Sequence, residues 1–225
     1  MNTRILSIAA IAALSAQTFA MGHSDWSVSA AYGVLMPVDS DSGAGWDVDA
    51  QTTTASSDPT DFTAKQKNAN FFDIAATHAK SGFGLMYSAT AKDTKFETTE
   101  DTNVTNTTGL SDFIWKYNGV YATYQHPLGQ MLDLTLAVGS VKQTFDNTTY
   151  SAPVSKRDLG ARVGIGAFYN LSKEAALKLG LSYHYFKEFN QAYVNTNSDD
   201  TTLTSATPKF DASGLAVSAA LVYSM

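Results

Sequence analysis

The end of the chain alternates regularly between apolar and small side chains. From Leu215 to Met225 every odd position is apolar, whereas the even positions are mostly small. A period of two places these two sets on opposite faces of a β-strand. At the end of a soluble sheet such a strand would leave an exposed, aggregation-prone edge. A closed membrane barrel, in contrast, needs a last strand that pairs with the first, so this segment predicts a transmembrane β-barrel.

Seven earlier segments alternate in the same way, each near the length that a tilted strand needs to cross a bilayer. They lie at about 26–36, 70–79, 83–91, 113–124, 132–139, 159–169 and 177–185. In the segment 113–124 we place the odd positions on the outer face, so that Phe113, Trp115, Tyr117 and Tyr121 face lipid. With the terminal strand, these segments predict eight strands.

The connections between the segments alternate in length. The links after the second, fourth and sixth segments are short, and residues 126–129 (His-Pro-Leu-Gly) have the composition of a turn. The other links, at roughly 38–69, 93–112, 143–157 and 187–209, are rich in Thr, Asn, Asp and Ser. Short periplasmic turns and long extracellular loops are typical of outer-membrane barrels, and an even strand number leaves both termini in the periplasm.

A soluble eight-stranded barrel of the lipocalin type also closes and alternates. Its apolar face points inward and its outer face carries the charges. Here the charged residues of the segments share a face with glycine and serine, which suits a narrow, polar lumen. We therefore predict an all-β fold, an eight-stranded antiparallel transmembrane up-and-down β-barrel.

The beginning of the chain has the features of a secretory signal peptide. Arg4 precedes an apolar run from Ile5 to Leu14, and Thr18-Phe19-Ala20 provides small residues for cleavage after Ala20. This run is too short to span a bilayer as a helix, and no later stretch is long enough. We expect residues 1–20 to be removed and residues 21–225 to form one barrel domain in the cell outer membrane.

The composition excludes several classes of function. The formal net charge of −6 argues against nucleic acid as a partner, because its binding needs a basic surface. The absence of cysteine excludes disulfides and thiolate metal sites. The chain has 12 Phe, 11 Tyr and 3 Trp but a mean hydropathy of only −0.13. This combination is typical of strands with one face in lipid and the other in a polar lumen.

Aromatic residues on the predicted outer faces fall at two levels, as expected at the two lipid interfaces. The predicted periplasmic girdle contains Trp26, Phe83, Tyr121, Tyr169 and Tyr223, and the predicted outer girdle contains Phe72, Trp115, Tyr117, Tyr183 and Tyr185. Leu, Val, Ile and Ala occupy much of the band between the two levels.

Five charged residues are predicted to point into the lumen: Asp73, Lys116, Asp133, Arg162 and Lys178. An eight-stranded barrel has a lumen that side chains fill, and buried charges there must pair. From their levels we expect Asp133 to meet Lys178, and Asp73 to meet Lys116 or Arg162. Paired charges would seal the lumen, whereas a polar pathway for ions or small solutes is the alternative.

Neither a metal site nor a cofactor site is predicted. His23, His78, His126 and His184 lie on separate segments without the spacing of metal ligands. Ser182 and His184 lie two residues apart on one face, so a Ser–His dyad is geometrically conceivable. An acidic stretch after the first segment lacks the Gly and Glu positions of an EF-hand and is interpreted as a solvated loop or a weak cation site; it contains Asp39, Asp41, Asp47 and Asp49.

The signal sequence, the eight alternating segments and the terminal pattern Leu215-x-Val217-x-Ala219-x-Leu221-x-Tyr223-x-Met225 resemble the small eight-stranded outer-membrane barrels of Gram-negative bacteria. This group includes OmpX/Ail, Opa-like and OmpW-like proteins. The resemblance implies that Leu221, Tyr223 and Met225 form the signal read by the barrel-insertion machinery. Met225 stands where the group usually has Phe.

Three functions compete. The first is a non-enzymatic surface barrel whose loops contact a host or cell-surface ligand, or lipopolysaccharide and other outer-membrane lipids. The second, which the OmpW-like resemblance implies, is a narrow channel for small or hydrophobic solutes. The third is a lipid-modifying outer-membrane enzyme, for which the only sequence support is the Ser182–His184 pair.

Overall fold

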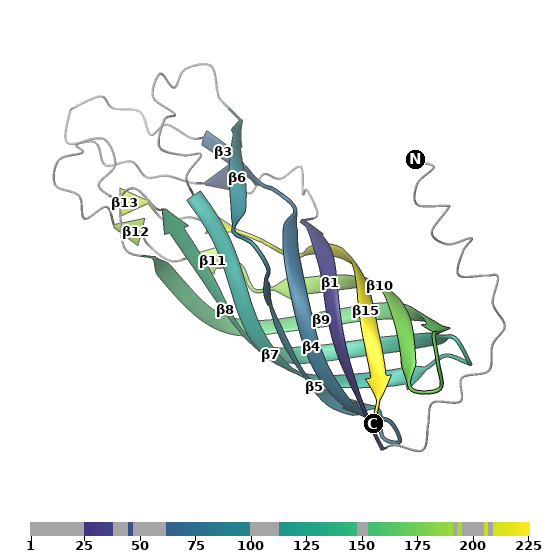
Figure 1. The fold of residues 1–225 in the computed structure, drawn as a ribbon. Coiled ribbons are helices and arrows are strands. Elements are labelled where there is room, and N and C mark those ends of the chain that lie inside the picture. Colours follow the sequence, from purple (N-terminus) through teal and green to yellow (C-terminus); the bar gives the residue numbers. More distant parts are fainter. Residues whose placement is uncertain are drawn as a thin grey trace, which may run out of the picture.

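The computed structural model describes residues 25–37, 45–46, 62–99, 113–147, 153–190, 193–194, 205–206 and 209–225. Eight long strands form an antiparallel barrel with both ends of the described chain at one mouth (Figure 1). They are β1 (Trp26–Pro37), β4 (Ala69–His78), β5 (Phe83–Thr90), β7 (Phe113–Pro127), β8 (Leu132–Asn147), β9 (Val154–Asn170), β10 (Ala175–Phe186) and β15 (Gly214–Ser224). The predicted eight-stranded fold is thus confirmed.

Seven shorter strands lie beyond the barrel at the mouth opposite the C-terminus (Figure 1). They are β2 (Gly45–Trp46), β3 (Phe62–Gln66), β6 (Thr94–Thr99), β11 (Phe189–Asn190), β12 (Tyr193–Val194), β13 (Ser205–Ala206) and β14 (Lys209–Phe210). β3 pairs with β2 and β6, and β6 in turn pairs with the start of β7. β8 and β9 also extend farther than predicted, into the segment 143–157 that was interpreted as a loop.

The last strand closes the barrel on the first. β15 pairs with β1 over the whole span from Ser27↔Ser224 to Pro37↔Gly214. The Met225 amide extends this ladder by donating to the Trp26 carbonyl at 3.0 Å. The apolar terminal strand therefore has no free edge, because its other side pairs with β10.

Three short turns connect strands at the mouth that carries the C-terminus. They lie at residues 79–82, 128–131 and 171–174. The turn predicted at 126–129 is shifted, because β7 continues through Pro127, which pairs with Asp133. Gly82 (φ 74°) and Gly129 (φ 108°) adopt left-handed backbone conformations that suit glycine.

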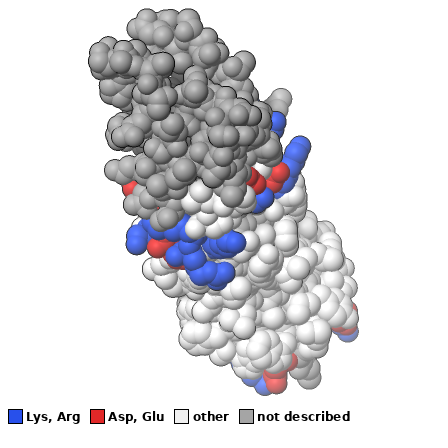
Figure 2. Space-filling view, turned by 90° about the vertical axis from the view of Figure 1, so that its left-hand side faces the viewer, with Lys and Arg blue, Asp and Glu red and all other residues white. Residues whose placement is uncertain are grey.

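The outer face of the barrel is apolar between two charged ends. On the face drawn in Figure 2, a broad band lacks Lys, Arg, Asp and Glu, which lie above and below it. Exposed aliphatic side chains of the outer face include Leu85, Leu132, Leu136, Val138, Val163, Ile165, Leu181 and Leu221, all between 43% and 64% exposed. A water-soluble barrel would carry charges on this surface. No helix in the described part of the chain is long and apolar enough to cross a membrane.

The predicted facing of β7 is wrong. Trp115, Tyr117 and Tyr121 are between 0% and 2% exposed and point into the lumen, whereas Val120 is 56% exposed on the outer face. Gly139 on β8 lies opposite Tyr121 in the ladder. The sequence thus predicts the alternation of β7 correctly but assigns the inward face to the lipid and the outward face to the lumen.

Candidate functional site

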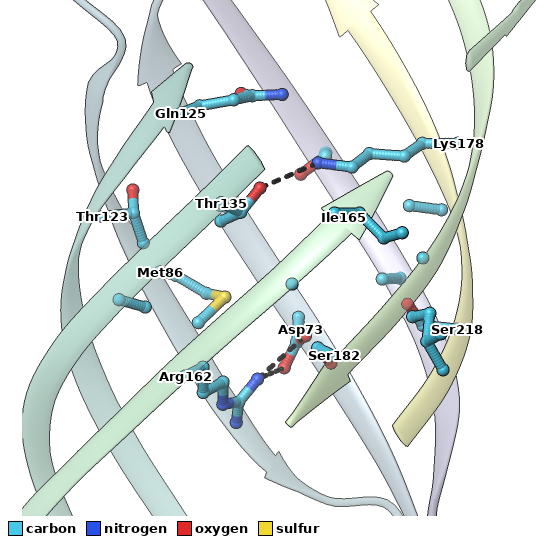
Figure 3. Close-up of a pocket in the computed structure, with 18 of the residues that line it drawn as sticks. Asp73, Met86, Thr123, Gln125, Thr135, Arg162, Ile165, Lys178, Ser182 and Ser218 are labelled. Atoms are coloured by element: carbon cyan, nitrogen blue, oxygen red, sulfur yellow. Dashed lines mark hydrogen bonds and ion pairs between the residues drawn. The ribbon is translucent and has the colours of Figure 1, made fainter. Parts of the chain in front are cut away.

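An ion pair crosses the lumen between strands that are far apart in the sequence. Arg162 on β9 is 8% exposed, and its Nη1 donates to both carboxylate oxygens of Asp73 on β4 at 3.1 Å (Figure 3). Its Nη2 donates to the Tyr117 hydroxyl at 3.3 Å and to the Ser88 hydroxyl. Of the two partners that the sequence left open for Asp73, the structure selects Arg162.

Aromatic rings surround the Arg162 guanidinium. Its Cζ lies 4.6 Å from the ring centroid of Tyr121, 5.6 Å from that of Phe71 and 6.0 Å from that of Tyr117. Cation–π attraction is strongest where the cation is removed from water. The rings therefore replace part of the hydration that Arg162 loses inside the barrel.

Glycine residues on the neighbouring strands lie beside Tyr121. The register places Tyr121, Gly139, Gly160 and Phe186 in one row across β7, β8, β9 and β10. A Cβ atom on Gly160 would lie 2.4 Å from Val141 Cγ2 and 3.3 Å from the Tyr121 hydroxyl. The absence of a side chain at Gly160 therefore leaves room for Val141 and for the Tyr121 ring, whereas a Cβ atom on Gly139 would meet the backbone of β7, 2.1 Å from the Val120 carbonyl oxygen.

An aromatic cluster fills the lumen on the side of Arg162 that faces away from the C-terminal mouth. Within it, the Phe186 ring lies 4.9 Å from Tyr117 and 5.6 Å from Trp115, and Phe71 lies 5.0 Å from His184. We call this cluster the aromatic plug; it consists of Phe71, Trp115, Tyr117, His184 and Phe186, each at most 2% exposed. The indole of Trp115 is hydrogen-bonded, since its Nε1 donates to Gln143 Oε1 at 3.2 Å.

A second ion pair lies nearer the C-terminal mouth. Lys178 Nζ on β10 donates to Asp133 Oδ2 on β8 at 2.6 Å and to Thr135 Oγ1 at 3.2 Å. Gln125 Nε2 donates to the same Asp133 oxygen, and the Lys178 ammonium lies 5.1 Å from the Phe168 ring centroid. The structure thus brings together Asp133 and Lys178, as their strand levels predicted.

A cavity of about 130 Å³ separates the two ion pairs (Figure 3). This volume has room for several water molecules. Its wall contains charged and hydroxyl side chains from several strands, including Asp73, Arg162, Lys178, Gln125, Ser182 and Ser218. The lumen therefore contains two ion pairs with a small cavity between them. The aromatic plug lies beyond the Arg162–Asp73 pair, on the side away from the C-terminal mouth.

The Ser182–His184 pair forms inside this lumen. Ser182 Oγ lies 3.0 Å from His184 Nε2, and both residues line the cavity. His184 Nδ1 is buried without a hydrogen-bond partner among the described residues, so no carboxylate orients the imidazole there. The pair faces away from the outer surface on which a membrane lipid would lie.

Lys116 lies outside the lumen, contrary to the prediction. Its side chain is 42% exposed, and its Nζ lies 3.8 Å from Asp146 Oδ2. The cause is the reversed facing of β7, which turns the even positions outward. Because Lys116 is absent from the lumen, Arg162 alone of the two candidates pairs with Asp73.

The predicted aromatic girdles are partly rearranged. Trp26, Phe83, Tyr169, Tyr183, Tyr185 and Tyr223 lie exposed on the outer face, and Phe72 is half-buried on it. Trp115, Tyr117 and Tyr121 lie inside the barrel instead. Three other tyrosines belong to the outer face: Tyr32 (55% exposed), Tyr87 (42% exposed) and Tyr124, which contacts Phe83 with ring centroids 5.0 Å apart. The alternation in the sequence also predicts that Tyr32 and Tyr87 face outward.

Several predicted features lie outside the described residues. These are the signal peptide at 1–20, His23 and the acidic residues Asp39, Asp41, Asp47 and Asp49. In the described part of the chain, no group of three or more His, Asp and Glu side chains is placed to hold a metal ion. Leu221 and Tyr223 are exposed on the outer face of β15, and Met225, which follows the strand, is also exposed.

Comparison with known structures identifies the class of fold. The outer membrane protein OprG from Pseudomonas aeruginosa superposes with a TM-score of 0.61 at 12% identity, over 93% of this chain and 99% of that chain. The outer membrane protein AlkL, studied in lipid bilayers, superposes with a TM-score of 0.51 at 14% identity, over 94% and 95%. No protein-family profile matches the sequence, and no curated protein matches it significantly. The chain has the fold of the small outer-membrane β-barrels, as the terminal pattern predicted.

Proposed function

We propose that this protein is a non-enzymatic barrel of the outer membrane whose lumen is sealed and which acts through the segments beyond the mouth opposite the C-terminus. The observation that carries the proposal is the filled lumen. The Arg162–Asp73 and Lys178–Asp133 pairs and the aromatic plug occupy it at successive levels. A barrel without a continuous path offers its outer surface and its connecting segments for contact with other molecules.

The placement in the outer membrane is supported by independent features. The exposed aliphatic side chains of the outer face match the hydrocarbon of a bilayer. Short turns lie at the mouth with the C-terminus, which is the periplasmic side in barrels of this kind. The sequence of residues 1–20 supports export.

Ionic conductance through the reconstituted barrel tests the sealed lumen. We expect the wild-type protein in a planar bilayer to give no current steps. A triple variant, Trp115→Ala, Tyr117→Ala and Phe186→Ala, removes the largest rings of the aromatic plug and should give small steps. A matched variant, Phe83→Ala, Tyr169→Ala and Tyr223→Ala, loses three aromatic side chains from the outer face and should remain silent. Steady current or solute uptake through the wild-type barrel would instead support the channel alternative.

Cell-based measurements test the role of the connecting segments. Residues 47–61 and 195–204 are replaced by short Gly-Ser linkers, and surface adhesion and resistance to detergents are compared with those of wild-type and deletion strains. We expect the linker variants to behave like the deletion strain although the barrel still assembles. A Ser182→Ala variant should behave like the wild type. If it abolished the phenotype while the linker variants kept it, an enzymatic function would replace our proposal.

A further inference from the structure

Three cationic side chains lie together on the outer surface, where the apolar band ends. Lys116 on β7, Lys142 on β8 and Arg157 on β9 occupy outward positions on adjacent strands. Lys142 lies opposite Arg157 in one ladder and opposite Asn118, two residues from Lys116, in the other. Figure 2 shows Lys and Arg side chains gathered at this boundary, directly above the uncharged band. We call these three residues the basic rim.

The basic rim has less anionic compensation than the cations of the lumen. Lys116 has a partner in Asp146, at the long distance of 3.8 Å. Arg157 donates from Nη1 to Ser140 Oγ at 3.5 Å, and neither Arg157 nor Lys142 forms an ion pair with a described residue. Like charges directly opposite each other on one face of a sheet are destabilising. An external anion between Lys142 and Arg157 would remove this repulsion.

The level of the basic rim coincides with the upper edge of the lipid-facing band. Along β8 the exposed Leu136 and Val138 precede Lys142, and along β9 Arg157 precedes the exposed Leu159 and Val163. Val120 on β7, two residues from Asn118, is 56% exposed, and Leu159 is 59% exposed. Lipid headgroups lie at the edge of the hydrocarbon layer, so cations that follow the exposed aliphatic side chains along a strand lie at the depth of those headgroups.

We propose that the basic rim binds the phosphate groups of a phosphorylated glycolipid in the outer leaflet. Lys142 and Arg157 provide charge-assisted donors, and the guanidinium can bind phosphate oxygens in a bidentate manner. Exposed Leu159, and Val138 beyond Ser140, follow the cations toward the C-terminal mouth and provide a surface for the acyl chains of the same molecule. This apolar surface distinguishes a lipid from a soluble anion. The inference rests on the proposed placement of the barrel in the outer membrane.

Lipid binding to the folded barrel tests this inference. The protein is refolded in dodecyl maltoside micelles and titrated with bisphosphorylated lipid A, with the same lipid lacking phosphates, or with inorganic phosphate, and the complexes are counted by native mass spectrometry. We expect binding of the phosphorylated lipid to exceed clearly that of the dephosphorylated lipid and of inorganic phosphate. The Lys142→Gln, Arg157→Gln double variant should bind the phosphorylated lipid more weakly by about fivefold per cation removed.

A second double variant serves as the control for loss of positive charge elsewhere on the barrel. Lys80→Gln, Lys173→Gln removes two cations from the turns at the C-terminal mouth and should leave lipid binding unchanged. Equal affinity for the phosphorylated and dephosphorylated lipid, or equal losses in both double variants, would overturn the inference while leaving the membrane placement intact. If the wild-type chain failed to insert into lipid vesicles as a heat-modifiable barrel, the membrane placement and the lipid site would both be wrong.

Discussion

Arg162 on β9 donates from Nη1 to both carboxylate oxygens of Asp73 on β4, 3.1 Å away across the lumen. The two residues are separated by 89 positions in the sequence. The pair joins opposite walls of the barrel, and the rings of Tyr121, Phe71 and Tyr117 surround the cation. Removal of this ion pair should therefore lower the free energy of unfolding more than removal of any other contact in the lumen.

Asp73→Ala should destabilise the barrel strongly, because it leaves Arg162 buried without its counterion. Breaking a buried pair in this way typically costs about 3–5 kcal/mol. Reversible urea unfolding in lipid vesicles, followed by tryptophan fluorescence, measures the change. The double variant Asp73→Leu, Arg162→Met should recover much of the loss, since apolar replacements of a buried pair are often neutral. A double variant no more stable than Asp73→Ala would contradict this account.

Asp25→Asn should have little effect on stability and provides a surface control. Asp25 pairs with Lys80 at 2.5 Å, but both side chains are largely exposed. The hydrogen bond from Lys80 and its charge lower the pKa of Asp25. A lowered carboxyl pKa means that any contribution of this pair is present at neutral pH and is lost as the pH falls through that pKa. Urea unfolding at pH 7 and pH 3 should therefore give a slightly smaller acid-induced loss for Asp25→Asn than for the wild type.

Gly160→Ala should destabilise the barrel by about 1–3 kcal/mol through overpacking. The added methyl group would lie 2.4 Å from Val141 Cγ2 and 3.3 Å from the Tyr121 hydroxyl. Adding Val141→Ala should be less costly in the Gly160→Ala background than alone, because it removes the clashing atom. Gly180→Ala is the matched control: its methyl group would meet only the Ser218 hydroxyl oxygen, at 2.7 Å, which can rotate away. Unfolding free energies of the four variants provide the comparison, and strictly additive effects at 160 and 141 would exclude the clash.

Nitroxide labels should report opposite environments at two adjacent positions of β7. The chain contains no cysteine, so Val120→Cys and Tyr121→Cys each give a single labelling site. In lipid vesicles the label at 120 should collide mainly with oxygen dissolved in the bilayer, and the label at 121 should be shielded within the lumen. Leu136→Cys and Ala137→Cys on β8 provide reference values for the outer and inner faces. Exchanged signals at 120 and 121 would mean that the odd positions of β7 face lipid.

The C-terminal residues should govern the rate of assembly if they form the proposed insertion signal. Tyr223→Ser should slow the appearance of the heat-modifiable form in vesicles that contain the barrel-insertion machinery, and Met225→Phe should accelerate it. Ser224→Ala changes the intervening inward position, which is 6% exposed, and should leave the rate close to that of the wild type. Equal rates for Tyr223→Ser and the wild type would refute the proposed signal.

Alternation was sufficient to predict most of the fold. In β8, for example, Leu132, Leu136 and Val138 point outward and Asp133 inward, because aliphatic and charged side chains have clear opposite preferences. The levels of Asp133 and Lys178 along their strands also predicted correctly that these two residues pair. The same logic failed for Trp115 and Tyr121, since an aromatic ring fits a lipid interface and a packed interior equally well.

The amino-acid sequence by itself determined a closed eight-stranded barrel with an apolar outer band, because the period of two, the turn residues and the terminal strand together allow few other folds. Only the tertiary structure decided which face of β7 points inward. The inward side chains Tyr117 and Tyr121 pack around Arg162 of β9 together with Phe71 of β4, although β4 and β9 are separated along the chain by three other strands of the barrel. Asp73 and Phe71 of β4 reach Arg162 of β9 only when the barrel closes, and this environment decides which face of β7 is buried.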